Sequence, residues 1–428
     1  MNQASPKRQR IAIIGAGISG LASAWLTAGH HDVTLFEAGD YAGGHTNTVD
    51  VELEGQRCAV DTGFLVFNEA TYPNLIALFQ QLELPCSGSD MSFSVSVDQG
   101  RDEWAGSSLS SVFAQRSKLL SPSFYGMLGD ILRFNAAATA NLQLAAGQGL
   151  TLGELLEQGS YGKRFRDHYL VPMAAAIWSS PASQILAFPA ETFLRFCMNH
   201  GLLQIRHRPR WFTVPGGARQ YVQKMLASLD DVRLSSPVSQ VERHEHGVTV
   251  SSRHGAEHFD SVIFATHAPQ TLRLLADATA EERAILGAVQ YQSNIAVLHT
   301  DTSLLPRRRQ VWSAWNFLSD GNGSGQRAVC VSYLLNKLQP LPIRTPLMVT
   351  LNPLQQPEAS QELARFLYEH PLLDAAAIEA QRRLPAIQGR RHCWFAGAWT
   401  GYGFHEDGLK SALRVAADFA PLPHWARL

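Results

Sequence analysis

The stretch IAIIGAGISGLASAWLTAGHHDVTLFEAG, residues 11–39, decides the fold of the N-terminal part of this chain. A strand over Ile11–Ile14 leads into a glycine turn, a helix that ends at Gly29, and a second strand over Val33–Phe36. This order is a compact βαβ unit, so it predicts an α/β fold class with a Rossmann-like domain.

Three glycines at fixed spacing in this unit predict a dinucleotide-binding site. Gly15 permits the tight turn, Gly17 lets the backbone approach a pyrophosphate, and Gly20 lets the helix pack on the strand. Ser19 lies in the first turn of the helix, where unpaired N–H groups favour phosphate. Glu37 ends the second strand, where a carboxylate accepts hydrogen bonds from ribose hydroxyl groups. These features suit FAD and NAD alike, so they leave the choice of dinucleotide open.

Length and composition limit the other possibilities. A chain of 428 residues exceeds the usual size of a single core, so we expect two domains. Lys plus Arg number 36 and Asp plus Glu number 37, which argues against a whole-chain electrostatic attraction to nucleic acid or to an anionic membrane and leaves only local patches for such contacts. The cysteines lack metal-ligand or disulfide spacing and are expected to be reduced and mostly buried; they are Cys58, Cys86, Cys197, Cys330 and Cys393. The 16 histidines show no H-E-x-x-H spacing, and the one H-x-x-x-H pair, His254 and His258, lies among the short alternating strands expected over residues 232–265, so no metal site is predicted.

Two short basic segments and the distribution of apolar residues bear on where the protein is located in the cell. KRQR before the apolar run at residues 11–14 resembles a signal peptide, but the glycine turn and following strand favour the βαβ interpretation. No stretch approaches the roughly 18 apolar residues that span a bilayer, so we expect a cytoplasmic protein. In LPRRRQVWSAW, Arg307–Arg309 lie beside two tryptophans. This loop is either a lipid-contacting segment, peripheral to the inner membrane, or a solvated basic turn.

The next stretch, YAGGHTNTVDVELEGQRCAVDTGFLVFN at residues 41–68, resembles the FAD-dependent amine oxidase and phytoene desaturase superfamily. In that superfamily a GG-Arg segment passes the flavin pyrophosphate, and a D-x-G turn follows a short strand pair. The resemblance implies FAD as the cofactor. It adds these residues to the expected cofactor site: Gly43, Gly44, His45, Thr46, Asp61 and Gly63. His45 stands where the arginine normally lies, and Asp61 has the alternative role of ordering its turn.

The resemblance also implies a domain organisation: a Rossmann-like FAD-binding domain of the GR2 flavoprotein type with an inserted α+β substrate domain. RWFTVPGGARQYVQKML at residues 210–226 looks like the P-x-G-G turn and helix of the superfamily, and Val238 would lie over the adenine side of FAD. The expected FAD-binding domain comprises residues 8–67, 205–269 and 385–428. The expected substrate domain comprises residues 68–204 and 270–384.

FAGAWTGYGFHEDGLKSALRVAADF at residues 395–419 looks like the closing strand and helix of these flavoproteins. The resemblance implies that Gly397 passes the ribityl chain and that the N–H groups of Gly408 and Leu409 face the flavin pyrimidine oxygen. Negative charge on the reduced ring would be stabilised there. Ala398 and Trp399 stand where the superfamily commonly has an acidic residue.

A narrower resemblance rests on DTGFLVFNEATYPNL, YLVPMAAAIWSSP, FPAETFLRFCMNHGLL, SYLLNKLQPL, VTLNP and GFHEDGLKSAL. Together they look like a bacterial subgroup of predicted NAD/FAD-binding proteins that is linked with cyclopropane-fatty-acid-synthase-like methyltransferases. The resemblance implies a lipid-modifying methyltransferase as a partner.

Candidates for a catalytic base are His405 and Glu406, with Asp407 as a third that could instead favour the helix start or contact the cofactor. Eight residues combine aromatic walls with hydrogen-bonding groups, and we expect fewer than half of them to touch substrate: Asn68, Tyr72, Trp178, Trp312, Trp315, Asn316, Tyr333 and Asn336.

The expected function is that of an FAD-dependent oxidoreductase acting on an apolar small-molecule or lipid substrate, with a fatty acyl chain as the first choice. Hydride transfer to flavin N5 gives desaturation, and return of the hydride at another carbon gives double-bond isomerisation. Amine oxidation is the alternative within enzymes. A non-catalytic flavin-binding accessory protein of a lipid methyltransferase is the alternative from another class.

Overall fold

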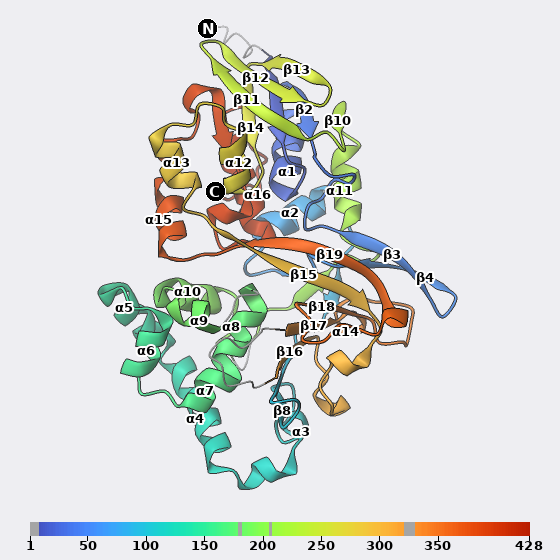
Figure 1. Ribbon diagram of the computed structural model, residues 1–428, viewed down its shortest axis with the longest axis vertical. Coiled ribbons are helices and arrows are strands. Elements are labelled where there is room, and N and C mark those ends of the chain that lie inside the picture. The colour runs from blue at the N-terminus through green and yellow to red at the C-terminus, as the bar shows by residue number, and fades with distance from the viewer. Residues whose placement is uncertain (1–7, 179–181, 205–207, 321–329) are drawn as a thin grey trace.

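The computed structural model describes residues 8–178, 182–204, 208–320 and 330–428. The described chain forms two lobes along its long axis, with two long strands running between them (Figure 1). The upper lobe in that view contains a five-stranded parallel sheet in the order β10-β2-β1-β14-β20. Its strands are β1 (Arg10–Ile14), β2 (Asp32–Phe36), β10 (Asp231–Arg233), β14 (Ser261–Phe264) and β20 (Cys393–Phe395).

The central strand β1 is buried on both faces, which explains why its sequence is a continuous apolar run. Ile13 pairs with Leu35 on one side and Ile263 on the other, in parallel register. Helix α1 (Ile18–Thr27) lies against both this strand and α16 (His405–Ala416), so the first and last elements of the fold share one core. The predicted Rossmann-like α/β domain is confirmed.

An antiparallel meander covers the edge of this lobe, formed by β11 (Val238–His244), β12 (Gly247–Ser252) and β13 (Gly255–Phe259). Its inner side chains join a core cluster with the parallel sheet and three helices: α12 (Ala268–Leu274), α13 (Ala280–Leu286) and α15 (Ala375–Arg383). Helices α13 and α15 fall inside the predicted substrate segment 270–384, as does most of α12, yet all three pack on the five-stranded parallel sheet. Helix α2 (Pro73–Gln81) does the same within segment 68–204. The domain boundaries therefore lie elsewhere than the sequence suggested, because apolar helix faces do not reveal which sheet they cover.

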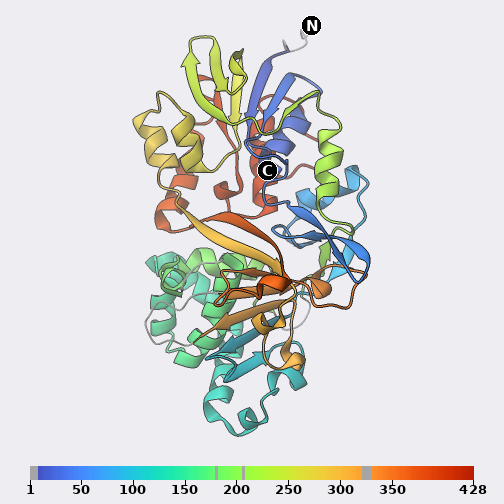
Figure 2. The same cartoon turned by 45° about the vertical axis from the view of Figure 1, so that its right-hand side comes forward.

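The chain crosses between the lobes in β15 (Tyr291–His299) and β19 (Glu362–Pro371), which pair along nearly their whole length. They belong to a seven-stranded sheet in the order β19-β15-β18-β17-β16-β7-β8. Its other strands are β7 (Phe93–Val97), β8 (Asp102–Ala105), β16 (Trp315–Ser319), β17 (Cys330–Leu334) and β18 (Met348–Leu351). The shorter strands of this mixed sheet lie beside the helices of the lower lobe (Figure 2).

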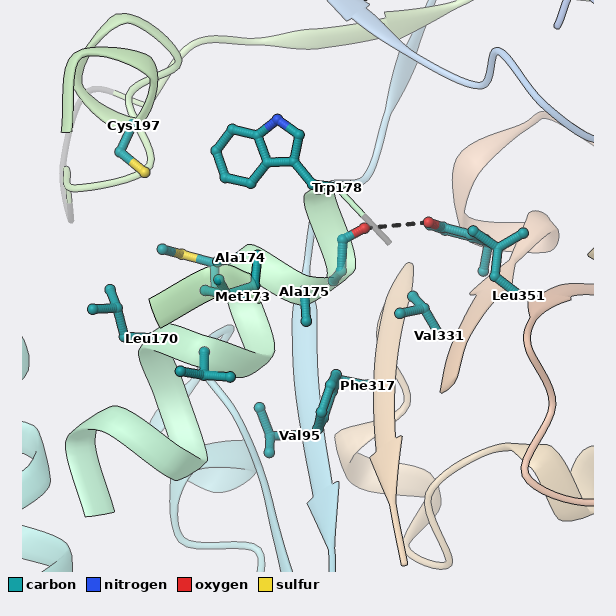
Figure 3. Packing of buried hydrophobic residues seen from close by; sticks show 14 of the residues in the cluster. Val95, Leu170, Met173, Ala174, Ala175, Trp178, Cys197, Phe317, Val331 and Leu351 are labelled. Carbon is teal, nitrogen blue, oxygen red and sulfur yellow. Dashed lines mark hydrogen bonds between the residues drawn. The ribbon is translucent and has the colours of Figure 1, made fainter. Parts of the chain in front are cut away.

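Helices cover that sheet on one side. They are α3 (Leu109–Val112), η1 (Arg116–Leu120), α4 (Pro122–Ala136), α5 (Ala138–Gln148), α6 (Leu152–Gln158), α7 (Lys163–Phe165), the π-helical turn η2 (Arg166–Leu170), α8 (Val171–Trp178), α9 (Ala182–Ala187) and α10 (Ala190–Asn199). Figure 3 shows side chains of α8 in one cluster with Val95, Phe317 and Val331 of the strands. Trp178, at the end of α8, points away from those strands.

Short elements complete the fold. The hairpin β3 (Thr48–Leu53) and β4 (Gln56–Asp61) projects from the upper lobe, and β5 (Phe67–Asn68), β9 (Trp211–Thr213) and β6 (Ser87–Ser89) form a small sheet. The remaining helices and turns are α11 (Arg219–Leu226), η3 (Thr302–Leu304), η4 (Arg309–Val311), α14 (Leu335–Leu338), η5 (Ala359–Gln361), η6 (Leu384–Ala386), η7 (Arg390–His392) and η8 (Ala398–Thr400).

Two further sequence-based expectations concern the cysteines and membrane-spanning helices. All five cysteines are free, four of them are buried and Cys86 is exposed, in agreement with the expectation of mostly buried thiols. Among the helices of the described ranges, none has the length and apolar character required to cross a lipid bilayer.

Candidate active site

A large cavity of about 1520 Å³ runs between the two lobes. Its wall includes the glycine turns of the parallel sheet at one end and the aromatic side chains of the helical lobe at the other. A typical small-molecule site occupies about 300–1,000 Å³. The cavity therefore has room for a dinucleotide and a second ligand.

The glycine end has the shape that a pyrophosphate requires. Gly15, Gly17, Gly43 and Gly44 line the cavity, and the Gly43 N–H donates to the Ala16 carbonyl at 2.8 Å, which holds the two glycine turns together. A Cβ built on Gly17 meets no atom within 4 Å, so the space in front of this N-cap residue is open. The first N–H groups of α1 face that space, as anion binding at a helix N-terminus requires.

Gly20 has a different task from Gly17. A Cβ at Gly20 would lie 1.7 Å from the Gly15 carbonyl oxygen, so this glycine is required for the helix to approach the turn. It does not line the cavity, whereas Ser19 does. The Ser19 hydroxyl donates to the Gly408 carbonyl at 3.0 Å, which ties α1 to α16.

Glu37 lines the cavity at the end of β2, together with Val238 of the meander. Its two carboxylate oxygens each accept a backbone N–H at 2.8 Å, one from Ala16 and one from Gly39. The carboxylate is thus fixed in place by the turn it supports, and its remaining lone pairs are left for ribose hydroxyl groups. This geometry brings the predicted phosphate, ribose and adenine contacts to one side of the cavity.

His45, which stands at the arginine position, is a neutral residue in this environment. Its ring stacks on Tyr368 with centroids 5.0 Å apart and tilts against His370 at 5.2 Å. Burial, and then the neighbouring His370, His267 and His405, hold the pKa of His45 well below its usual value. Its Nε2 atom is buried with no hydrogen-bond partner, although the ring lines the cavity. A bound dinucleotide would give this nitrogen a partner, but His45 cannot supply the positive charge of an arginine.

Asp61 lies outside the cavity, and Gly63 lines it. The Asp61 carboxylate accepts hydrogen bonds from the Thr48 hydroxyl, the Ala218 N–H and the Gln339 amide. Burial raises the pKa of Asp61 to about 7. The side chain therefore clamps the β3–β4 hairpin to two distant segments, which agrees with the alternative that it orders its turn.

The closing helix α16 presents other N–H groups than those expected. Gly397 lines the cavity, and its N–H donates to Ser411 Oγ at 2.9 Å. The Gly408 N–H already donates to the Phe404 carbonyl at 3.0 Å, and neither Gly408 nor Leu409 lines the cavity. The open N–H groups of this helix are those of its first turn, residues 405–407. A Cβ at Gly408 would lie 2.7 Å from Ile18 Cγ2, so Gly408 serves the close contact with α1.

His405 is the one catalytic candidate that the structure places in the cavity wall. Its ring stacks on Phe64 with centroids 3.7 Å apart, and Nε2 lies 2.8 Å from the Thr46 hydroxyl and 3.3 Å from the Tyr221 hydroxyl. Thr46 does not line the cavity and instead supports this ring from behind. Burial lowers the pKa of His405 to about 3, so the imidazole is neutral at ordinary pH.

Glu406 and Asp407 point away from the cavity. The Glu406 carboxylate accepts hydrogen bonds from the N–H and side-chain amide of Asn74 and from the Leu75 N–H, so it caps the N-terminus of α2. Asp407 accepts the Phe404 N–H at 3.0 Å, and burial raises its pKa to about 6. In this geometry Glu406 holds the start of α2 in position. His405 is therefore the remaining candidate for proton transfer.

The opposite end of the cavity is an aromatic chamber. Four of the eight predicted pocket residues line it, namely Tyr72, Trp178, Trp315 and Tyr333. The other four lie outside it: Asn68, Trp312, Asn316 and Asn336. The two buried asparagines, Asn68 and Asn316, satisfy backbone groups of their own turns.

Sequence reasoning missed most of this chamber, which also includes Trp104, Tyr169, Met173, Phe196, His200, Trp211, Tyr402 and Phe404. Tyr169 lies in the π-helical turn η2, which interrupts the 3.6-residue period just before α8. Such single π-turns occur frequently at functional sites. The amino-acid pattern carries no simple signal for such a turn.

The buried histidines of this site predict acid sensitivity. Burial lowers the pKa of His200 to about 4, so between pH 6.5 and 4 the unfolded chain binds a proton there that the folded protein does not. The free energy of unfolding therefore falls as the pH falls through this window. We expect His200→Gln to remove about 3 kcal/mol of this dependence. Denaturant titrations of both proteins at pH 7 and pH 4 measure it, and an unchanged pH dependence contradicts the prediction.

The fold and this cavity define a two-lobed protein with a Rossmann-like sheet, a candidate dinucleotide site and an adjoining aromatic chamber. The sequence profile described as flavin containing amine oxidoreductase matches residues 18–355 of the chain. The chain belongs to this family, whose members are FAD-dependent oxidoreductases, and the glycine end of the cavity is the candidate FAD site.

Individual proteins resemble the chain at lower identity. The putative flavin-containing monoamine oxidase AofH of Mycobacterium tuberculosis is 27% identical over 276 residues, which are 60% of this chain and 56% of that protein. The chain thus matches little more than half the length of this relative. The crystal structure of a CLA-producing fatty acid isomerase from P. acnes has a TM-score of 0.68 at 14% identity, covering 97% of this chain and 100% of that one. Cyclohexylamine oxidase from Brevibacterium oxydans has a TM-score of 0.67 at 17% identity, covering 96% and 98%. These structures share the fold.

Proposed function

We propose that the protein is an FAD-dependent oxidoreductase that acts on a fatty acyl chain. The observation that carries this proposal is the chamber beyond the glycine turns, whose wall is mainly aromatic and aliphatic. An acyl chain gains about 0.8 kcal/mol for each methylene that such a wall removes from water. Binding energy of this kind leaves only the reacting carbon to be aligned with the cofactor.

The acidic residues of the cavity wall support an apolar or anionic substrate over a cationic one. Among the described residues, three carboxylates line the cavity, and each already has partners. Glu37 accepts backbone N–H groups, Asp90 pairs with Lys337 at 3.2 Å, and Glu369 pairs with His267 at 3.2 Å. Arg208 also lines the cavity and is exposed. An exposed guanidinium at the wall of an apolar chamber suits the carboxylate of a fatty acid.

FAD, when bound, supplies a hydride acceptor. The aromatic chamber would hold the alkyl chain and exclude water, while the first turn of α16 would present its N–H groups to developing negative charge. His405 would hold or move a proton at its imidazole, supported by Thr46 and Phe64. Loss of a hydride from one carbon and of a proton from its neighbour would give an alkene. In a chain that already holds a double bond, loss of a hydride from the carbon beside that bond and its return at the far end of the three-carbon unit would move the double bond.

Amine oxidation is the second candidate, because the family profile and AofH carry amine oxidase descriptions. Against it stands the absence, among the described cavity residues, of a carboxylate without a partner to hold an ammonium group. The resemblance to the methyltransferase-linked subgroup supports a lipid substrate and a lipid methyltransferase partner. If this chain is instead a non-catalytic accessory protein of such a methyltransferase, we expect that no substrate reduces the flavin.

Anaerobic mixing of the purified flavoprotein with fatty acids, amines, carotenoids and bacterial lipid extract separates these possibilities. We expect acyl chains to bleach the flavin absorbance or, for an isomerase, to return with moved double bonds in mass spectra. Fast reduction by a primary or secondary amine together with unchanged lipids would establish amine oxidation. No reduction or conversion, with a methyltransferase retained in pull-downs, would establish the accessory role.

Arg208 gives a narrower test of the substrate class. We expect Arg208→Gln to raise KM for a free fatty acid about two- to fivefold with little change in kcat, because an exposed charge pair contributes about 0.2–1 kcal/mol. The methyl ester of the same acid lacks the charge, so its KM should be the same for both proteins. Equal effects on acid and ester would remove Arg208 from carboxylate recognition.

A further inference from the structure

We propose that the lower end of the helical lobe is a docking surface for an anionic lipid bilayer. The surface, called the apex here, consists of α3, η1, the first turn of α4 and η4. It lies at the end of the molecule opposite the parallel sheet (Figures 1 and 2). Docking itself does not depend on the reaction, whereas delivery of an acyl chain through the apex rests on the proposed function.

The apex exposes large apolar side chains that a folded protein normally buries. Leu109 is 79% exposed, Leu119 49%, Leu120 89% and Tyr125 47%. They belong to one surface: the Tyr125 hydroxyl donates to the Leu119 carbonyl at 3.2 Å, and the Tyr125 ring lies 6.0 Å from that of Phe113, at the end of α3. Contiguous exposed apolar groups of this kind mark protein or membrane contact sites.

A buried ion-pair network around Lys118 holds Leu119 and Leu120 in positions that face solvent. Lys118 is only 5% exposed, and its ammonium pairs with Asp102 at 2.5 Å and donates to the Glu103 carbonyl at 2.7 Å. The next two residues, Leu119 and Leu120, consequently face solvent. A buried lysine followed by two exposed leucines reverses the usual arrangement of a soluble surface. The network makes this arrangement a built feature of the fold.

The positive charge of the apex favours an anionic lipid surface as its partner. No aspartate or glutamate occurs in residues 104–129 or 302–319. Arg116, Arg307 and Arg309 are exposed there. Gln310, in η4, donates to the Ala114 carbonyl at 2.9 Å, which places the arginines beside the leucines. Leucines inserted among acyl chains, with arginines at the level of the phosphates, match an anionic bilayer surface.

The apex is continuous with the cavity. Gly106 and Ser107 are exposed, line the cavity, and directly precede Ser108, the N-cap residue of α3. Trp104, two residues earlier, also lines it. A lipid that leaves a bilayer at the apex therefore reaches the aromatic chamber without crossing the upper lobe.

Sedimentation of the flavoprotein with vesicles tests the proposal. We expect binding to phosphatidylcholine vesicles that contain phosphatidylglycerol, weaker binding without it, and release by salt. Leu119→Ser with Leu120→Ser should reduce the bound fraction to less than about a tenth, and Arg116→Gln with Arg309→Gln should weaken binding about 30-fold. The matched control is Leu367→Ser, because Leu367 is 65% exposed on β19 and lies outside the apex.

Three results would overturn the proposal: no vesicle binding by the native protein, equal loss in the Leu367 control, or a native dimer that the double-leucine variant converts to a monomer. The last result would assign the apex to self-association. All variants should retain FAD and their melting temperature, because the changed side chains are exposed. Turnover of a short soluble acyl substrate should be unchanged in them, which separates failure of docking from failure of the proposed function.

Discussion

Gly17→Val should yield a folded protein that contains no FAD. A side chain at Gly17 enters open space, since no protein atom lies within 4 Å of the Cβ position. The backbone there is extended, with φ −70° and ψ −179°, which a β-branched residue adopts readily. We therefore expect the stability of the fold to be unchanged. The pyrophosphate, in contrast, would clash with the new methyl groups. We expect the affinity for FAD to fall more than about 100-fold, or about 2.7 kcal/mol.

Gly20→Ala is the matched control, because it changes the same motif for a different physical reason. Its Cβ would lie 1.7 Å from the Gly15 carbonyl oxygen, so the helix could not approach the strand. We expect this variant to lose more than about 4 kcal/mol of stability or to remain insoluble. Flavin absorbance after denaturation and circular dichroism distinguish the two outcomes. Normal FAD content in Gly17→Val would show that the glycine spacing serves packing alone.

The contrast between these two glycines shows how far the sequence leads. The order of strand, glycine turn, helix and acidic residue predicted the parallel strands and the glycine turn that lines the cavity, because each is a local pattern. The closing helix was also predicted, from the resemblance of residues 395–419 to the closing strand and helix of these flavoproteins. Its orientation was not. Which N–H groups remain open depends on where the helix begins, and the start at His405 leaves Gly408 inside the hydrogen-bonded turn.

Features that depend on packing between distant segments escaped the sequence. Nothing local indicates that Glu406 caps α2, since its partners Asn74 and Leu75 lie more than 300 residues away in the chain. The aromatic chamber likewise takes its residues from β8, η2, α8, α10 and the closing turn, which only the tertiary fold brings together. The same limit explains why α13 and α15 were assigned to the wrong lobe.

His405→Gln should keep FAD bound but slow flavin reduction by about 10²–10⁴. Glutamine can retain the hydrogen bond that links His405 to Thr46, so the frame of the cavity persists, but an amide cannot hold a proton. Because burial lowers the pKa of His405 to about 3, the ring is neutral throughout the working range. The rate that depends on it should therefore show no inflection near pH 6.5 in the free enzyme.

Glu406→Gln is the control for His405→Gln, because it changes a neighbouring residue that we expect to affect stability and not the rate of flavin reduction. The carboxylate accepts three hydrogen bonds at the start of α2, and an amide would turn its own donors toward some of those N–H groups. We expect a loss of about 1–3 kcal/mol in stability, with the reduction rate per bound flavin unchanged. Stopped-flow absorbance, scaled to flavin content, measures the rate, and thermal unfolding measures the stability. If the His405 variant reduces its flavin at the native rate while the Glu406 variant does not, proton transfer must be reassigned to Glu406, and α16 would have to turn that carboxylate from α2 into the cavity.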